Sequence, residues 1–255
     1  MIRSRAPTDK PYAAALSLHA VTFACETCPI GLEGNCPASP AFPGLQLTRT
    51  ARKQVQAGAE IYPANETPST VAIIQSGWAV QYARLQTGER QILYFLLPGD
   101  LFDQYAVVMP QTATLFGFSA LTDVAICQFS IEEYRELLQA DVRSRRFAKR
   151  QIRRRQALMA KHLINMGQRR ALGRLVRFLL ELRQRLSEQG LVHDETMPFP
   201  LRQEDIADAL GLTHAHVNRT LRHLREIGAI EFSSGTLHIL DVAALTALAP
   251  GVLVL

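Results

Sequence analysis

The stretch Leu201–Gly228 reads LRQEDIADALGLTHAHVNRTLRHLREIG, and its pattern predicts two short helices joined by a tight turn. Apolar residues recur at helical spacing over 203–210 and again over 214–227. Gly211 lies where the first helix should end, because glycine readily adopts the left-handed backbone conformation found there. Thr213 can accept a backbone hydrogen bond at the start of the second helix. This stretch is therefore predicted to fold as a helix-turn-helix.

The second of these helices is expected to have one apolar and one polar face. Its apolar residues Val217, Leu221 and Leu224 would pack against the first helix. The polar face carries arginine and asparagine, which are suited to bidentate contacts with guanine and adenine in the major groove of DNA. A surface hairpin with solvated cations is the alternative, and His216 is as well explained by solvent as by DNA. The residues expected to contact DNA are Thr213, His214, His216, Asn218, Arg219 and Arg222.

A small β-hairpin is predicted directly after this stretch. Residues 229–232 and 236–240 alternate between apolar and polar side chains, and Ser-Ser-Gly at 233–235 separates them. A helix-turn-helix followed by such a hairpin is a winged helix-turn-helix. The sequence therefore predicts a compact C-terminal unit that combines helices with a short β-hairpin.

A long helix is predicted before this unit, after a break near Asp141. Its apolar residues recur at alternating intervals of three and four, as in a helix that packs against a partner helix. One position of this repeat, between Ile152 and Met159, is polar and is filled by Arg155 or Gln156. Gly167 is expected to interrupt this helix. Packing of the helix against a second copy of itself predicts a homodimer. The residues expected at its interface are Ala148, Ile152, Met159, Leu163 and Met166.

Residues 45 to 130 have the pattern of a small antiparallel β structure. Short runs rich in β-branched and aromatic residues, such as 71–74, 78–82 and 91–95, are separated by turn signals that include Pro-Gly-Asp at 98–100. Several short strands at this spacing are typical of a sandwich or barrel. The N-terminal half is therefore expected to be a β domain.

Composition and motifs narrow the class of protein. The net charge of +5 favours an anionic partner, although so modest an excess does not identify one. The eight cations between Arg143 and Arg155 are expected to form mostly a solvated helix face with some nonspecific attraction for DNA. Neither a membrane-spanning run nor a secretory signal is expected, which points to the cytoplasm. Catalysis is not expected, because the seven histidines are scattered and the sequence has no nucleophile elbow, phosphate-binding glycine loop or His-Glu-x-x-His motif.

The four cysteines match the ligand pattern of a metal centre. Cys25 and Cys28 form a C-x2-C motif, Cys36 follows in the same N-terminal segment, and Cys127 lies in a β-like run. Four thiolates from a loop and a strand suit either a tetrahedral zinc ion or an iron–sulfur cluster. Redox-active thiols without a metal, or inert cysteines that pack as small apolar residues, are the alternatives.

The order of these units resembles the cyclic-AMP-receptor and fumarate-nitrate-regulator (CRP/FNR) superfamily of bacterial transcription factors. The most specific motifs are RQILYFLLPGDLF at 90–102 and DIADALGLT at 205–213, followed by VNRTL at 217–221. The resemblance implies a homodimer that binds a palindromic site in double-stranded DNA, with RNA polymerase as a further partner. It also makes Arg219 the strongest candidate for a base contact, because the matching arginine is shared by many members.

The resemblance implies an α+β chain with an N-terminal β-roll like a cyclic-nucleotide-binding domain, a long dimerisation helix and a C-terminal winged helix-turn-helix. The expected parts are a cysteine-containing segment at 1–44, the β-roll sensor domain at 45–138, the dimerisation helix at 139–166 and the DNA-binding domain at 167–255. A cyclic nucleotide is not expected as ligand, because residues 99–120 contain no Arg or Lys to neutralise its phosphate.

The cysteines resemble those of the oxygen-sensing branch, in which three N-terminal cysteines and one from the β-roll ligate a [4Fe–4S] cluster. The resemblance implies a cluster held by Cys25, Cys28, Cys36 and Cys127, although the gap between the second and third cysteine is longer than in the best-known members. Ala215 and Asn218 replace the glutamate and serine usual in this branch, so the resemblance does not imply the branch's usual operator. A member without a cluster, which responds to a small molecule or to thiol oxidation, is the alternative.

Overall fold

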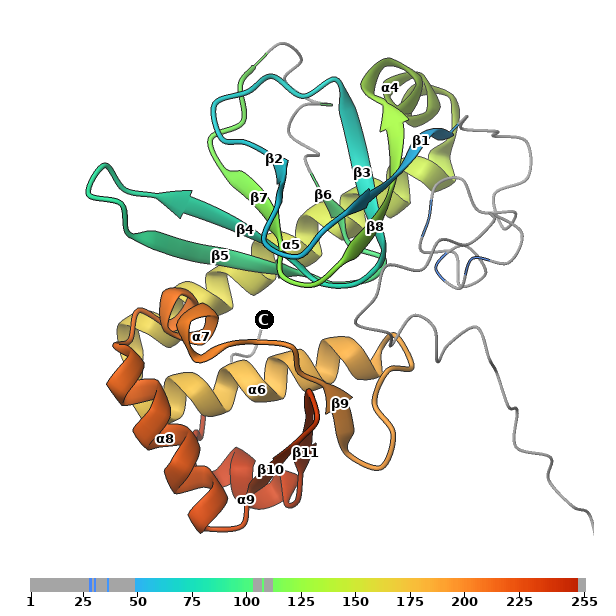
Figure 1. Cartoon of the computed structure of the whole chain (residues 1–255). Helices are drawn as coiled ribbons and strands as arrows, with labels where there is room; N and C mark the ends of the chain where they lie inside the picture. The colour runs from blue at the N-terminus through green and yellow to red at the C-terminus, as the bar shows by residue number, and fades with distance from the viewer. Residues whose placement is uncertain are drawn as a thin grey trace, which may run out of the picture.

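The computed structural model of the chain describes residues 49–102, 107 and 112–251, together with Cys28, Ile30 and Cys36. Figure 1 shows two β-sheets above a smaller unit of helices and short strands, with one long helix running from the first unit to the second. The fold is the predicted α+β arrangement of a β-roll, a long helix and a winged helix-turn-helix. None of the helices in the described ranges has the length and apolar character needed to cross a membrane.

The β-roll consists of two four-stranded antiparallel sheets, with strand orders β1-β8-β3-β6 and β2-β7-β4-β5. Side chains of the two sheets meet in an apolar core around Ile74, Phe102 and Phe118. The short strand β7 (Gly117–Ala120) pairs with both β2 and β4. The strands are Arg49–Val55 (β1), Glu60–Tyr62 (β2), Thr70–Ser76 (β3), Ala79–Arg84 (β4), Arg90–Leu96 (β5), Leu101–Phe102 (β6), Gly117–Ala120 (β7) and Val124–Ser130 (β8).

Strands β3 and β8 are buried on both faces. Alternate residues of a strand point to opposite sides of a sheet. Ile74 and Ile126 therefore face the core between the sheets, whereas Ile73 and Cys127 face a second apolar cluster against α4 (Ile131–Ala140). This second face explains why the two strands read as nearly continuous apolar runs in the sequence.

Two long helices connect the β-roll to the C-terminal unit. Helix α5 is Val142–Gln168 and helix α6 is Ala171–Ser187. Asp141 ends α4 and begins α5, because its side chain accepts a hydrogen bond from the Ser144 amide at 2.7 Å. Helix α5 ends at Gln168, one residue after Gly167, and Arg169 and Arg170 separate it from α6. The expected interruption near Gly167 is therefore confirmed to within two residues.

The C-terminal unit is a winged helix-turn-helix with more regular structure than predicted. The two helices and the hairpin lie where the sequence placed them, whereas β9 and α9 were not predicted because each is very short. Strand β9 joins the wing in a sheet of order β10-β11-β9. The elements are β9 (Thr196–Pro198), α7 (Gln203–Leu210), α8 (His214–Glu226), β10 (Ile230–Ser233), β11 (Thr236–Ile239) and α9 (Val242–Ala247).

A buried ion pair joins the β-roll to the C-terminal unit. Arg185 of α6 donates to Asp100 of the Pro-Gly-Asp turn and to the carbonyl of Phe95, both at 2.7 Å. The two charged side chains are only 4% and 5% exposed. Asp100 also accepts the Leu97 amide of its own turn at 2.8 Å. The carboxylate therefore fixes the turn and holds the guanidinium of a helix from the other unit.

The ring of Tyr94 brings a third element to the same place. The guanidinium carbons of Arg155 and Arg185 lie 4.8 and 4.6 Å from its centroid, so α5, α6 and β5 meet at one aromatic ring. Burial raises the pKa of Tyr94 to about 12, which keeps the phenol neutral. The neutral hydroxyl accepts a hydrogen bond from Arg185 at 3.1 Å. This junction joins the long helix, the β-roll and the C-terminal unit at one buried ring.

Replacing Arg185 with methionine is expected to destabilise the chain strongly. Arg185→Met leaves Asp100 buried without its counter-charge, which typically costs about 3–5 kcal/mol. The double variant Arg185→Met, Asp100→Asn should recover part of this loss, because it also removes the uncompensated charge. Urea unfolding followed by circular dichroism measures the difference in free energy of unfolding.

Arg183→Met is the matched control for this experiment. Arg183 lies on the same helix and pairs with Glu195, but both side chains are partly exposed. Such a pair typically contributes at most about 1 kcal/mol. Equal losses in the Arg185 and Arg183 variants would contradict a special role for the buried pair.

Candidate nucleic-acid interface

The turn between α7 and α8 has the geometry that its sequence predicts. Gly211 adopts the left-handed conformation, with φ 59° and ψ 44°, and its amide donates to the carbonyl of Ala207. The hydroxyl of Thr213 accepts the amide of His216 at 3.3 Å and so begins α8. Arg174 of α6 donates to the carbonyl of Leu210 at 3.1 Å, which ties the end of α7 to the helix beneath it. Both predicted caps, at Gly211 and Thr213, are confirmed.

Helix α8 separates its side chains as predicted. Val217, Leu221 and Leu224 are buried against the rest of the C-terminal unit. Figure 1 shows α8 at the outer edge of this unit, away from the β-roll. The helix contains no acidic residue before Glu226, so its exposed face is neutral or positive over most of its length. All the residues predicted to contact DNA are exposed: Thr213, His214, His216, Asn218, Arg219 and Arg222.

One contact on this surface was not predicted. The side-chain amide of Asn218 donates to the side-chain oxygen of Gln203 at 3.2 Å, so the start of α7 positions a candidate base-contacting group on α8. Nothing in the sequence distinguishes Gln203 from an ordinary surface glutamine. Only the crossing of the two helices brings it next to Asn218.

The predicted dimer residues on α5 fall into two groups. Ile152 and Leu163 are 44% and 71% exposed, which is unusual for large apolar side chains and leaves an apolar stripe open to solvent. Ala148 is already buried within the chain. Met166 approaches the helix-turn-helix, since a Cβ placed on Gly211 would lie 3.2 Å from its methyl carbon. Part of the predicted interface therefore packs within the chain, while the stripe remains available to a partner helix.

The structure distinguishes between Arg155 and Gln156 at the polar position of the apolar repeat in α5. Arg155 is buried against Tyr94, whereas Gln156 is exposed. Of the two alternatives, Gln156 therefore occupies the exposed side of the helix. Arg155 is one of the eight cations in the basic run, and it belongs to the interior rather than to a solvated face.

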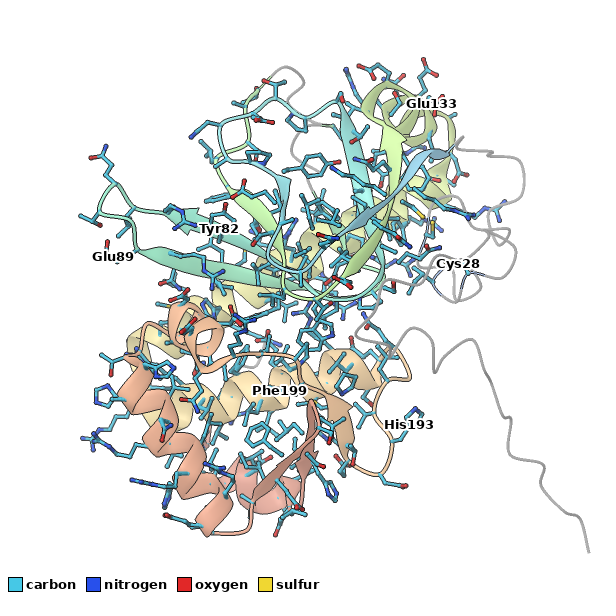
Figure 2. All side chains as sticks on the ribbon, viewed as in Figure 1. Cys28, Tyr82, Glu89, Glu133, His193 and Phe199 are labelled. Carbon is cyan, nitrogen blue, oxygen red and sulfur yellow. The ribbon has the colours of Figure 1, made fainter. Side chains whose placement is uncertain are left out.

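Three of the four predicted cysteine ligands gather on one side of the β-roll. Cys28, Cys36 and Cys127, which we call the cysteine cluster, share an apolar environment with Tyr134 of α4. Gln75 donates to the sulfur of Cys28 at 3.5 Å. Burial, and secondarily the nearby Cys36, raise the pKa of Tyr134 well above its usual value. Figure 2 labels Cys28 at this side of the β-roll.

The cysteine cluster does not by itself form a metal site. Within the described residues, no group of three or more Cys, His, Asp or Glu side chains is arranged to hold a metal ion. Cys25, the fourth predicted ligand, lies outside the described residues. The chain thus brings three thiols into one apolar environment, which suits the surroundings of an iron–sulfur cluster. The described residues do not supply the set of ligands that such a cluster needs.

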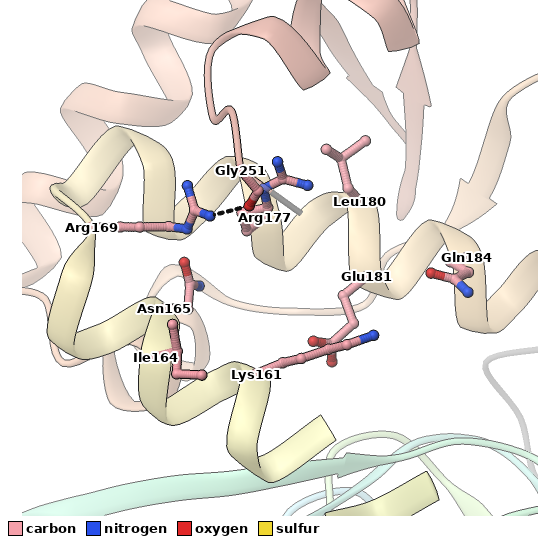
Figure 3. A pocket seen from close by; sticks show the side chains of 9 residues that line it. All are labelled: Lys161, Ile164, Asn165, Arg169, Arg177, Leu180, Glu181, Gln184 and Gly251. Atoms are coloured by element: carbon pink, nitrogen blue, oxygen red, sulfur yellow. Dashed lines mark hydrogen bonds between the residues drawn. The ribbon is translucent and has the colours of Figure 1, made fainter. Parts of the chain in front are cut away.

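A small cavity lies between α5 and α6, near the point where they join (Figure 3). Its volume is about 140 Å³. Arg169 donates to the carbonyls of Pro250 and Gly251 at 2.8 and 2.5 Å, so this cation holds the end of the described chain. Burial raises the pKa of Glu181, which lies opposite Lys161. These contacts make the cavity part of the connection between the two helices.

Comparisons with known proteins agree with this architecture. A family model described as a cyclic nucleotide-binding domain matches residues 52–141, and one described as a Crp-like helix-turn-helix domain matches residues 173–248. The chain is 30% identical over 233 residues to the nitrogen fixation regulation protein FixK of Bradyrhizobium diazoefficiens, covering 88% of this chain and 93% of the relative. It is 26% identical over 198 residues to the anaerobic regulatory protein of Pasteurella multocida, covering 76% of this chain and 70% of the relative.

The fold is also similar to a solved structure. The structure of FixK2 from Bradyrhizobium japonicum superposes with a TM-score of 0.71 at 24% identity, covering 80% of this chain and 98% of that one. The matches include both the β-roll and the winged helix-turn-helix, and the FixK relative spans nearly the whole chain. The chain therefore belongs to the CRP/FNR family of DNA-binding transcription regulators, which are not enzymes.

Proposed function

We propose that this chain is a homodimeric regulator that binds a palindromic site in double-stranded DNA through α8 and takes its input from the cysteines. The observation that carries the proposal is the exposed polar face of α8, held on a helix-turn-helix that is fixed to the β-roll. The regulator acts in the cytoplasm, and RNA polymerase is a further partner.

Residues on α8 have distinct roles in this proposal. Arg219 contacts guanine, because a guanidinium can donate two hydrogen bonds to one base edge. Asn218 contacts a neighbouring base and is oriented by Gln203. Thr213 and His216 lie at the start of the helix, where the unpaired amides and the helix dipole favour a phosphate group. His214 and Arg222 extend the same exposed surface.

Dimerisation uses the exposed stripe on α5. Ile152 and Leu163, with Met159 between them, present apolar surface that a second copy of the same helix covers. Two copies related by a twofold axis place their recognition helices about 34 Å apart, one turn of DNA. A palindromic operator matches this symmetry.

The cysteines supply the input signal. Cys25, Cys28, Cys36 and Cys127 would hold a [4Fe–4S] cluster, which when bound supplies sensitivity to oxygen. The proximity of three of these thiols supports the proposal, as does the similarity to a relative named an anaerobic regulatory protein. The cysteine cluster belongs to the same buried apolar cluster as Phe147, near the start of α5, and this shared packing would carry a change at the cysteines to the long helix.

A regulator without a metal is the second candidate. The described cysteines form no coordination set, and Cys28 and Cys127 are buried among apolar residues. In this case thiol oxidation or a small molecule bound elsewhere supplies the signal. The two candidates share the same DNA-binding output and differ only in the input.

Arg219→Ala tests the proposed output. A preferred duplex is first selected from a randomised pool with the unmodified chain, and binding is then measured by fluorescence anisotropy. Loss of a bidentate base contact should weaken binding to the selected duplex by about tenfold to a hundredfold and relax the preference at one base pair. Arg225→Ala, at the far end of the same helix, should weaken binding only slightly. Equal effects of the two substitutions would contradict base recognition by Arg219.

Anaerobic purification tests the proposed input. The cluster predicts about four iron and four sulfide per chain, with loss of both in Cys28→Ala and weaker DNA binding after exposure to air. Absence of iron and sulfide, together with DNA affinity unchanged by air, would overturn oxygen sensing by a cluster. That result would favour the second candidate and leave the DNA-binding function intact.

A further inference from the structure

Strand β5 holds the first helix of the helix-turn-helix through its side chains. Arg90 donates to Asp205 and to Asp208 of α7, both at 2.8 Å. The side-chain amide of Gln91 donates to the carbonyls of Asp208 and Ala209 at 2.6 and 3.2 Å. These residues of β5 and α7, which we call the β5–α7 clamp, connect segments more than a hundred residues apart in the chain.

The clamp is partly shielded from water. The side chains of Arg90 and Asp205 are 24% and 10% exposed, so their attraction is less screened than in an open surface pair. Arg90 also neutralises two carboxylates that lie one helical turn apart and would otherwise repel each other. Asp205 has a second role, because it accepts the Arg202 amide and begins α7.

An apolar core continues beneath the clamp. Phe95 of β5 and Phe178 of α6 have ring centroids 5.2 Å apart, and Ile92 belongs to the same buried cluster as Leu210 at the end of α7. Tilting the helix-turn-helix away from β5 would therefore expose apolar surface as well as break the clamp. The position of α7 on the β-roll is defined by both polar and apolar contacts.

The clamp leaves the DNA-binding face open. It grips α7, whereas the exposed side chains of α8, including Asn218 and Arg219, lie outside it. Only Arg169 and Arg170 connect α5 to α6, and both have extended backbone conformations. The Arg170 carbonyl accepts the Arg174 amide at 2.9 Å, so the connection is tied to the start of α6, and the contacts between β5 and α7 supply a further restraint on the direction of α8.

We propose that Arg90 and Gln91 are positioning residues for DNA recognition: the β5–α7 clamp sets the separation and angle of the two recognition helices and so determines which half-site spacing the dimer accepts. This inference rests on the proposed function as a dimer on a palindrome. The sensor's β4–β5 hairpin is thereby a structural part of operator selection although it does not touch DNA.

The test compares two duplexes that differ only in spacing. One is the palindrome selected by the unmodified chain, and the other carries two additional base pairs at its centre. Arg90→Met should weaken binding to the palindrome by about tenfold while changing binding to the lengthened duplex little, so the preference between them falls. A merely destabilised variant would lose affinity for both duplexes equally, because only its active fraction would drop.

Arg84→Met is the matched control. Arg84 pairs in register with Arg90 on the same hairpin, but it is exposed and donates to Gly88 within the hairpin. Its substitution should leave the spacing preference unchanged. The exchange Arg90→Asp, Asp208→Arg restores one ion pair in the opposite direction, and it should recover part of the preference. If Arg90→Met does not fold, Asp208→Asn is a milder variant that removes one carboxylate of the clamp.

The outcomes separate the two proposals. If the unmodified chain prefers the palindrome but Arg90→Met and Asp208→Asn keep the same preference, the clamp proposal alone is overturned. Stronger binding of these variants to the palindrome would also overturn it, because the clamp would then oppose DNA binding. If the unmodified chain prefers neither spacing, the proposed function fails and the clamp proposal fails with it.

Discussion

The buried pair between Asp100 and Arg185 is the constraint on which the remaining contacts depend. A carboxylate in an apolar core needs a counter-charge, and a guanidinium in the same place needs acceptors. Asp100 is fixed by its own turn, so Arg185 can be satisfied only if α6 lies directly beneath β5. That placement brings α7 within reach of Arg90 and brings Arg155 onto Tyr94. The DNA-binding unit is therefore located by electrostatics in a place where apolar packing alone would tolerate small shifts.

Local sequence patterns predicted most of the elements but few of the contacts between them. The helix-turn-helix was predicted almost residue by residue, because its glycine, its threonine cap and its apolar spacing all agree with one another. The end of the long helix was predicted to within two residues, because Gly167 is the last residue but one of α5. Strand β9 and helix α9 were missed because three to six residues are too few to show a period.

In the candidate sites too, local features were predicted and long-range contacts were not. The exposed face of α8 was predicted because the spacing of the apolar residues leaves only one side for the polar ones. Arg90, Gln203 and Arg185 were not identified, because each depends on a partner far away in the sequence. The four cysteines were recognised from their number and spacing, and the fold brings Cys127 to Cys28 and Cys36. Whether a thiol set binds a metal depends on the relative directions of the sulfur atoms, which spacing does not determine.

The continuous core across the β-roll and the winged unit has a consequence for cooperativity and for modularity. Leu175, Leu179 and Leu182 of α6 belong to the same buried cluster as Val80 and Ile92 of the β-roll. Two regions that share a core melt together, so heating should produce a single calorimetric transition. A separately expressed winged unit would expose its half of that core to solvent as an apolar surface prone to aggregation. Exchange of DNA-binding units between relatives would therefore succeed only when the matching face of the sensor is transferred as well.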